Sequence, residues 1–215
     1  MMSMKNLLNG MKSILFPVLF LFAVSAPAQV YSNKESSRFS FTAGMTSSKL
    51  LHDSVHYKPG ISFGGGFMYN VALSDQLNIG MEALYNGKAF KKESPIIKYR
   101  YFYIDVPVYL QYKLGENIRF NAGGQVSVFT NSKIVLIDGG NTTGVNVKNY
   151  SSIKWTDYSV LGGMEFDLTE DISMGLRYTV STSTFFRNDQ PDFGVFEVSL
   201  NYAVYRSHRQ FGKKE

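Results

Sequence analysis

The sequence predicts an all-β protein, an eight-stranded antiparallel transmembrane β-barrel with an up-and-down meander. Three observations predict it. Apolar and polar residues alternate along strand-length segments. The connections between these segments are alternately short and long, as in membrane barrels. After Gln29 no apolar stretch reaches the ~20 residues that a membrane-spanning helix needs. The composition agrees, with 19 Gly, 15% aromatic residues and 6 Pro.

The first 28 residues are typical of a secretory signal peptide. Lys5 and Lys12 supply its positive region, Ile14 to Val24 form its apolar region, and Ala26-Pro27-Ala28 is the small-residue cleavage site. The alternative is a retained membrane anchor, but the apolar run is shorter than the ~20 residues that a helix needs to cross a bilayer. Met11 is an alternative start. We expect residues 29–36 to form an N-terminal periplasmic segment.

The barrel domain is predicted over residues 37–205, and a polar tail over 206–215. The eight candidate strands are roughly 37–45, 60–73, 76–88, 97–114, 117–130, 153–168, 171–183 and 193–205. Tight turns at Ser74-Asp75, Gly115-Glu116 and Thr169-Glu170 join strands two and three, four and five, and six and seven. The other connections are longer, so we expect the turns in the periplasm and four loops outside the cell.

The segment 97–114 shows which face meets lipid. One face carries Phe102, Ile104, Val106, Val108, Leu110 and Tyr112, and the other carries Tyr101, Tyr103, Asp105, Pro107, Tyr109, Gln111 and Lys113. Eleven residues at ~3.3 Å each, tilted by ~45°, cover ~25 Å, the height of the lipid-facing band of a membrane barrel. Pro107 cannot donate to the strand ladder, which predicts a bulge or a locally open register.

The polar faces of the segments collect seven charged residues, which we predict to form a network in the lumen: Glu82, Asp105, Lys113, Arg119, Glu165, Arg177 and Glu197. Unpaired charges cost several kcal/mol to bury, so these groups need one another or water. Since the interior of an eight-stranded barrel is just filled by side chains, we expect no wide pore.

Several segments resemble the small outer-membrane β-barrel family of Bacteroidota that includes PorT-type proteins. They are the Ala28-Gln29 junction, "GISFGGGFMYNVALSDQLNIGMEALY" at 60–85, "YFYIDVPVYLQYKL" at 101–114, and the closing "GLRYTVSTS" and "FEVSLNYAVY". The resemblance spans approximately 37–205. It implies a barrel in the cell outer membrane, in contact with outer-membrane lipid and inserted by the outer-membrane assembly machinery. One branch of the family is implicated in protein secretion.

No residues assemble into a catalytic, cofactor or metal site in the sequence. Only His52, His56 and His208 could act as bases, near Ser54 and Asp53 or beside Ser207, and loop solvation explains them better. The run Gly64-Gly65-Gly66 lacks the Lys-Ser/Thr of a phosphate loop, which favours close backbone packing or a bulge. Without Cys there is no disulfide framework or thiolate metal site.

We therefore expect a non-enzymatic structural or interaction protein that supports secretion or surface adhesion. The connection 131–152 contains the apolar Ile134 to Ile137 and the turn sequence 138–141, so it can extend a hairpin above the membrane and bind a protein partner by strand addition. Two alternatives stay open: a lipid-modifying barrel enzyme, and a soluble periplasmic ligand-binding barrel with its apolar faces inward. Nucleic acid is not expected, because losing Lys5 and Lys12 lowers the net charge from +5 to +3.

Overall fold

The structure, a computed structural model, describes residues 35–51, 57–92, 96–115, 117–138, 141–147, 155–182 and 192–208. Its strands are β1 (Glu35–Leu51), β2 (Lys58–Ala72), β3 (Leu77–Lys92), β4 (Ile96–Leu114), β5 (Ile118–Asp138), β6 (Asn141–Val147), β7 (Thr156–Asp167), β8 (Ile172–Ser181) and β9 (Asp192–His208). The predicted signal peptide lies outside the described residues. No helix among the described residues is long and apolar enough to cross a membrane.

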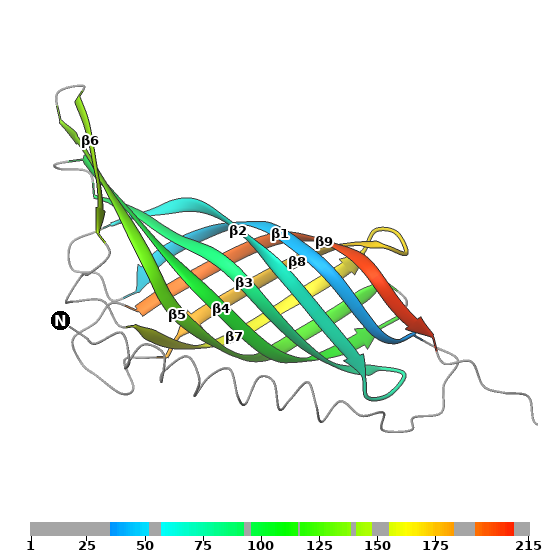
Figure 1. The fold of residues 1–215 in the computed structure, drawn as a ribbon. Helices are drawn as coiled ribbons and strands as arrows, with labels where there is room; N and C mark the ends of the chain where they lie inside the picture. The colour runs from blue at the N-terminus through cyan, green and yellow to red at the C-terminus, as the bar shows by residue number, and fades with distance from the viewer. Residues whose placement is uncertain are drawn as a thin grey trace, which may run out of the picture. The chain divides into compact units, whose positions relative to one another are not determined.

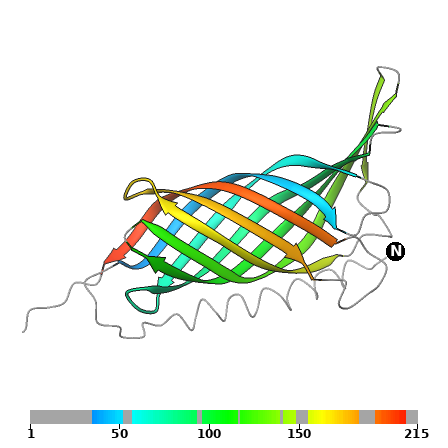
Figure 2. The same ribbon diagram turned by 180° about the vertical axis from the view of Figure 1, so that it is seen from behind.

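Eight of these strands close into a ring. The hydrogen-bonded order is β4-β3-β2-β1-β9-β8-β7-β5, and a further pairing of β4 with β5 joins the two ends (Figure 1). Every neighbouring pair is antiparallel. Seen from behind, β7, β8 and β9 complete the wall (Figure 2). The predicted eight-stranded antiparallel meander is confirmed.

The ninth strand, β6, stands outside the ring and pairs with the outer end of β5. Asp138 lies opposite Asn141, so the predicted turn sequence at 138–141 joins the two strands. The hairpin rises beyond the end of the barrel on the side opposite the short turns (Figure 1). The predicted hairpin extension is therefore present, and β6 is its second strand.

The first and last strands of the ring, β1 and β9, pair along a seam, and both run further than the sequence pattern indicates. β1 begins at Glu35, inside the segment expected to precede the barrel, and Glu35 lies opposite His208. As a result β9 continues past its predicted end at residue 205, and Arg206 lies opposite Arg38. Each strand extends because the other supplies backbone partners, which the alternation of either segment alone does not reveal.

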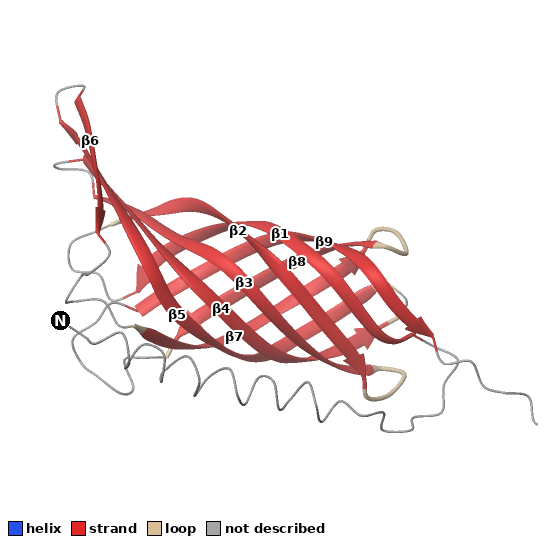
Figure 3. Ribbon diagram, viewed as in Figure 1, coloured by secondary structure: helices blue, strands red, loops and turns tan. Residues whose placement is uncertain are grey.

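The barrel is apolar outside and polar inside. Phe63 is 69% exposed and Leu200 is 55% exposed, whereas Gln111 and Ser127 are completely buried. Strands make up almost the whole wall, with loops at its ends (Figure 3). An outward apolar surface of this extent is stable only against lipid, so the alternative of a soluble barrel with inward apolar faces was wrong.

Side chains close the short turns. The Ser74 hydroxyl accepts hydrogen bonds from the backbone N–H of Leu77 (3.1 Å) and of Gln76 (3.3 Å). The Thr169 hydroxyl accepts one from the N–H of Ile172 (3.0 Å). Gly115 has a φ of 74°, which favours glycine. Short turns lie on the periplasmic side in outer-membrane barrels, so we expect this end of the barrel to face the periplasm and name it accordingly.

The ladder between β3 and β4 opens at Pro107. Met81 lies opposite Val108 and Leu84 lies opposite Asp105, but the register contains no pairs between them. The register itself does not shift, so Pro107 interrupts hydrogen bonding without a bulge in this ladder. The predicted locally open register is confirmed.

The facing of β9 predicts the cost of a charge in the lipid band. Val198→Arg should lower the free energy of unfolding by about 2–4 kcal/mol, since Val198 faces outward near the middle of the strand. Tyr202→Arg, near the periplasmic end, should cost only about 0–1 kcal/mol. Urea unfolding in lipid vesicles measures both, and equal costs at the two positions would contradict the assigned depth.

Candidate functional site

The lumen holds its charged side chains at three levels. We call them the periplasmic cluster (Arg38, Arg119, Glu165 and Asp167), the central cluster (Glu82, Arg177 and Glu197) and the outer cluster (Lys88, Asp105 and Asp157). Six of the seven predicted network residues belong to these clusters. The seventh, Lys113, lines a recess at the periplasmic end together with Arg38 and Arg119.

Glu165 is the centre of the periplasmic cluster and is 2% exposed. Its carboxylate accepts hydrogen bonds from Gln111 (2.8 Å), Arg119 (3.0 Å), Ser173 and Asn201 (3.3 Å). These donors belong to β4, β5, β8 and β9, so one carboxylate ties together four strands besides its own. A buried carboxylate needs hydrogen-bond donors of this kind, because a buried polar group without partners is costly.

Arg119 extends this cluster toward the periplasmic mouth. Its guanidinium also donates to Asp167, which in turn pairs with Arg38 of β1 at 3.5 Å. The chain of contacts therefore reaches from β5 through β7 to β1. These two acids and two cations neutralise one another.

The central cluster crosses the lumen. Arg177 of β8 donates two hydrogen bonds to the Glu82 carboxylate of β3, one of them from Nη1 at 2.9 Å. In the ring order β3 and β8 are four strands apart in either direction, so the two residues stand on opposite walls. Glu197 lies directly opposite Arg177 in the β8–β9 ladder and is also buried. A bidentate ion pair of this kind joins the two walls strongly.

Tyr109 packs beside this crossing pair, with its ring centroid 5.6 Å from the Arg177 guanidinium carbon. Gly80 lies opposite Tyr109 in the β3–β4 ladder. A Cβ at residue 80 would come within 2.3 Å of the Tyr109 ring, so glycine makes room for the ring.

The outer cluster contains an ion pair that the sequence prediction missed. Lys88 of β3 donates to Asp157 of β7 at 3.0 Å, and both side chains are buried. Asp105 accepts a hydrogen bond from Asn86 at 3.1 Å. Lys88 has the same strand phase as Glu82, which is a signal for an inward side chain, but it stood at the last position of the predicted segment 76–88.

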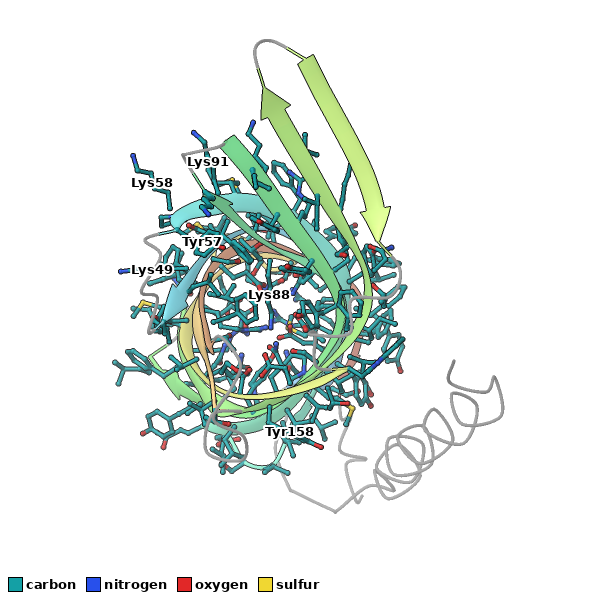
Figure 4. The ribbon with its side chains drawn as sticks, turned by 90° about the vertical axis from the view of Figure 1, so that its left-hand side faces the viewer. Lys49, Tyr57, Lys58, Lys88, Lys91 and Tyr158 are labelled. Carbon is teal, nitrogen blue, oxygen red and sulfur yellow. The ribbon has the colours of Figure 1, made fainter. Side chains whose placement is uncertain are left out.

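Above the outer cluster, inward-facing aromatic and aliphatic side chains close the extracellular mouth. This mouth plug consists of Leu50, Phe90, Tyr101, Tyr103, Phe129, Phe193 and Val195, with Tyr57 and Tyr99 packed against it. The Lys88 ammonium lies 4.3 Å from the centroid of the Tyr103 ring and 5.1 Å from that of Phe193. Figure 4 shows Lys88 inside the ring, and Lys49, Lys58 and Lys91 outside it.

The catalytic candidates do not form a site among the described residues. His52, Asp53, Ser54 and His56 lie outside the described residues. His208 is the last residue of β9. The described part of the chain contains no group of three or more His, Cys, Asp or Glu residues that could hold a metal ion.

The run Gly64-Gly65-Gly66 lies inside β2, and the register of β2 with β3 is irregular between Pro59 and Gly64. The run is thus strand backbone next to a bulge. A Cβ at Gly66 would also lie 1.9 Å from the Ala83 carbonyl oxygen, so the prediction of close backbone packing or a bulge in place of a phosphate loop is confirmed.

A closed ring of eight antiparallel strands, apolar outside and charge-paired inside, defines a small transmembrane β-barrel. The chain belongs to the outer membrane protein beta-barrel domain family, which it matches over residues 16–203. Its location is the cell outer membrane, as the sequence predicted. No curated protein matches the chain as a relative.

Solved barrels of other proteins are similar in structure. The crystal structure of Ail, the attachment invasion locus protein of Yersinia pestis, has a TM-score of 0.51 at 14% identity over 80% of this chain and 100% of that one. Neisserial surface protein A has 0.44 at 13% identity, over 78% and 99%. OprG from Pseudomonas aeruginosa has 0.40 at 10%, over 82% and 100%. The likeness to Ail supports the eight-stranded fold.

The crossing ion pair predicts an asymmetry between single and double substitutions. Arg177→Met should lower the free energy of unfolding by about 3–5 kcal/mol, because it leaves Glu82 and Glu197 buried without their cation. The double variant Glu82→Gln/Arg177→Met should be more stable than Arg177→Met alone, since only one of the two carboxylates is then left buried without a cation.

Urea unfolding of the folded barrel in lipid vesicles gives these values. Arg100→Met is the matched control, because Arg100 is exposed outside the barrel and its loss should change stability by no more than ~0.5 kcal/mol. A double variant less stable than Arg177→Met would show that the ion pair is not what holds these two walls together.

Proposed function

We propose that this protein is a non-enzymatic outer-membrane scaffold that binds a partner protein by strand addition to its β5–β6 hairpin. One observation carries the proposal. In the described structure β6 (Asn141–Val147) pairs with β5 along one edge and has no strand on its other edge. A strand at the end of a sheet presents backbone N–H and C=O groups to which an extended segment can pair.

The hairpin is joined to a firm base. Above the barrel, β4 and β5 stay paired up to Ile96 opposite Ile137, and β3 pairs with β4 up to Lys92 opposite Ile97. One side of the wall therefore continues outward as a sheet, with β6 as its free edge (Figure 1). An edge held on a sheet is preorganised, which lowers the entropy lost when a partner strand binds.

The filled lumen supports a role at the surface over one in transport. The mouth plug covers the extracellular end, and the Arg177–Glu82 ion pair crosses the middle. Nearer the periplasmic end, Glu165 accepts hydrogen bonds from side chains of four other strands. Described side chains therefore occupy the lumen at each of these three levels, which is not the arrangement of a wide pore. The interior charges are engaged with one another, which favours a structural network over acid–base catalysis.

The PorT-type resemblance favours a protein of a secretion pathway as the partner. If the protein instead serves in surface adhesion, the partner would be a protein of another cell. In both cases an extended segment of that protein would pair with β6. Insertion by the outer-membrane assembly machinery is part of the same proposal, because a barrel whose outside is apolar needs delivery to its membrane.

A shortened hairpin tests the proposal. Val135 lies opposite Gly144, so replacing residues 136–143 with Asn-Gly gives a two-residue hairpin turn that keeps the register below it. A photo-crosslinking residue at Val145, in living cells, should capture a defined protein. In the shortened variant the yield should fall about tenfold or more, as expected for the loss of at least 1.4 kcal/mol of binding.

The matched control carries the same photo-crosslinking residue at Thr182, which follows β8 at the same end of the barrel. Heat-modifiable gel migration should be unchanged in the shortened variant, because β6 is not part of the ring. Equal capture by the full-length and shortened hairpins, or capture from Thr182 alone, would contradict partner binding at β6.

A further inference from the structure

The register of the β5–β6 hairpin determines which backbone groups of β6 point away from β5. Asp138 lies opposite Asn141, and only residues 139 and 140 come between them in the chain. If this facing pair were of the non-hydrogen-bonded kind, the ladder would need bonds between residues 139 and 140, which are neighbours in the chain. Asp138 and Asn141 are therefore a hydrogen-bonded pair, as in other hairpins with a two-residue loop.

The same register assigns the rest of β6, because hydrogen-bonded and non-hydrogen-bonded pairs alternate along an antiparallel ladder. Three further residues of β6 direct their backbone N–H and C=O groups toward β5: Thr143, Val145 and Val147. The residues between them direct the same groups away from β5: Thr142, Gly144 and Asn146.

We call the backbone of Thr142, Gly144 and Asn146 the docking edge. β6 is the last strand in the hydrogen-bonded order of the described sheet, so these groups lie along its outer side (Figure 1). Each residue has one N–H donor and one C=O acceptor. An extended segment that lies along β6 can therefore form a hydrogen bond with every group of the docking edge.

Gly144 is the middle residue of the docking edge and lies directly opposite Val135 of β5. A glycine inside a strand weakens the strand, and it often marks a place where another backbone or a ligand approaches closely. Because glycine has no side chain, a large side chain of an added strand can extend over Gly144 to Val135, which is half-buried. Aromatic side chains suit this position, since they cover glycines in neighbouring strands and pair well with β-branched residues.

From these observations we propose that the docking edge binds an extended segment of the partner protein that carries an aromatic side chain opposite Gly144. The inference rests on the partner binding proposed above. It adds the residues of β6 that form the hydrogen bonds and the chemistry of the segment that they select.

Amide hydrogen exchange tests the docking edge without any partner. The full-length barrel is folded in phosphatidylcholine nanodiscs, and exchange rates are corrected for the local sequence. The N–H groups of Thr143 and Val145 should exchange at least about tenfold more slowly than those of Gly144 and Asn146, because only the former are bonded to β5. Equal protection of all four amides in the free protein would overturn the proposal.

Proline substitutions test the hydrogen bonds to the partner. Asn146→Pro removes one N–H of the docking edge and keeps the bonds to β5, since an edge strand tolerates proline where its N–H points outward. Capture from a photo-crosslinking residue at Val145 in living cells should fall about fivefold, and at least about tenfold in Thr142→Pro/Asn146→Pro.

The matched control, Asn146→Ala, keeps the N–H and should capture the partner as the wild type does. Slow exchange of the Val145 N–H shows that the hairpin still forms in each variant. If Asn146→Pro loses that protection, Thr142→Pro, which lies next to the turn, takes its place. Capture that persists in the proline variants but is lost in the shortened hairpin would overturn the docking edge and leave partner binding at the hairpin in place.

A synthetic probe tests the chemistry of the segment. The probe is a seven-residue peptide that alternates Thr and Val, with Phe in place of the central Val, and the control peptide has Ala there. The Phe peptide should bind about threefold or more tightly, as followed by the NMR shifts of the Gly144 and Asn146 amides. Equal affinities of the two peptides, or shifts that spare these amides, would overturn the proposal. If the wild type captures no protein in cells, the proposed function fails, and the peptides still decide whether the docking edge binds a strand.

Discussion

The structure depends on one constraint: within a bilayer every backbone N–H and C=O must find its partner in the protein. A sheet meets this condition only when it closes, because an open edge would leave a row of unpaired groups in hydrocarbon. β1 pairs with β9 as well as with β2, and so removes the last edge of the ring. Closure places one face of each strand toward lipid and the other toward the lumen. The apolar exterior and the polar interior both follow from it.

The interior of the barrel holds mainly polar side chains, unlike the apolar core of a soluble protein. Polar side chains enclosed in a narrow lumen must satisfy one another, and here they do so across the barrel as well as between neighbours. Glu165 gathers donors from four strands, and Arg177 reaches Glu82 on the opposite wall. These contacts hold distant strands at fixed separations. The mouth plug adds the ordinary hydrophobic packing that the rest of the lumen lacks.

The faces of the strands were predictable from the sequence, because a period of two assigns every residue of a strand once one residue is assigned. The alternation over 101–113 is thus confirmed residue by residue. Pairing across the lumen was not predictable, since it depends on how far each strand is staggered against the next. Phe90 was missed because its strand continues beyond the predicted segment 76–88, and Lys88 because it is the last residue of that segment. Residues 1–28 lie outside the described residues, so the signal peptide stays a prediction.

The seam between β1 and β9 also determines the order in which the barrel can form. β1 holds the first described strand of the chain and β9 the last, so their contacts have the largest sequence separation in the fold. Contacts of this kind form slowly, because a long loop must close before they gain any free energy. Until β9 arrives, β1 and β8 each keep an open edge that can pair with another chain. The growing barrel is therefore a species that needs protection from aggregation until its final strand is in place.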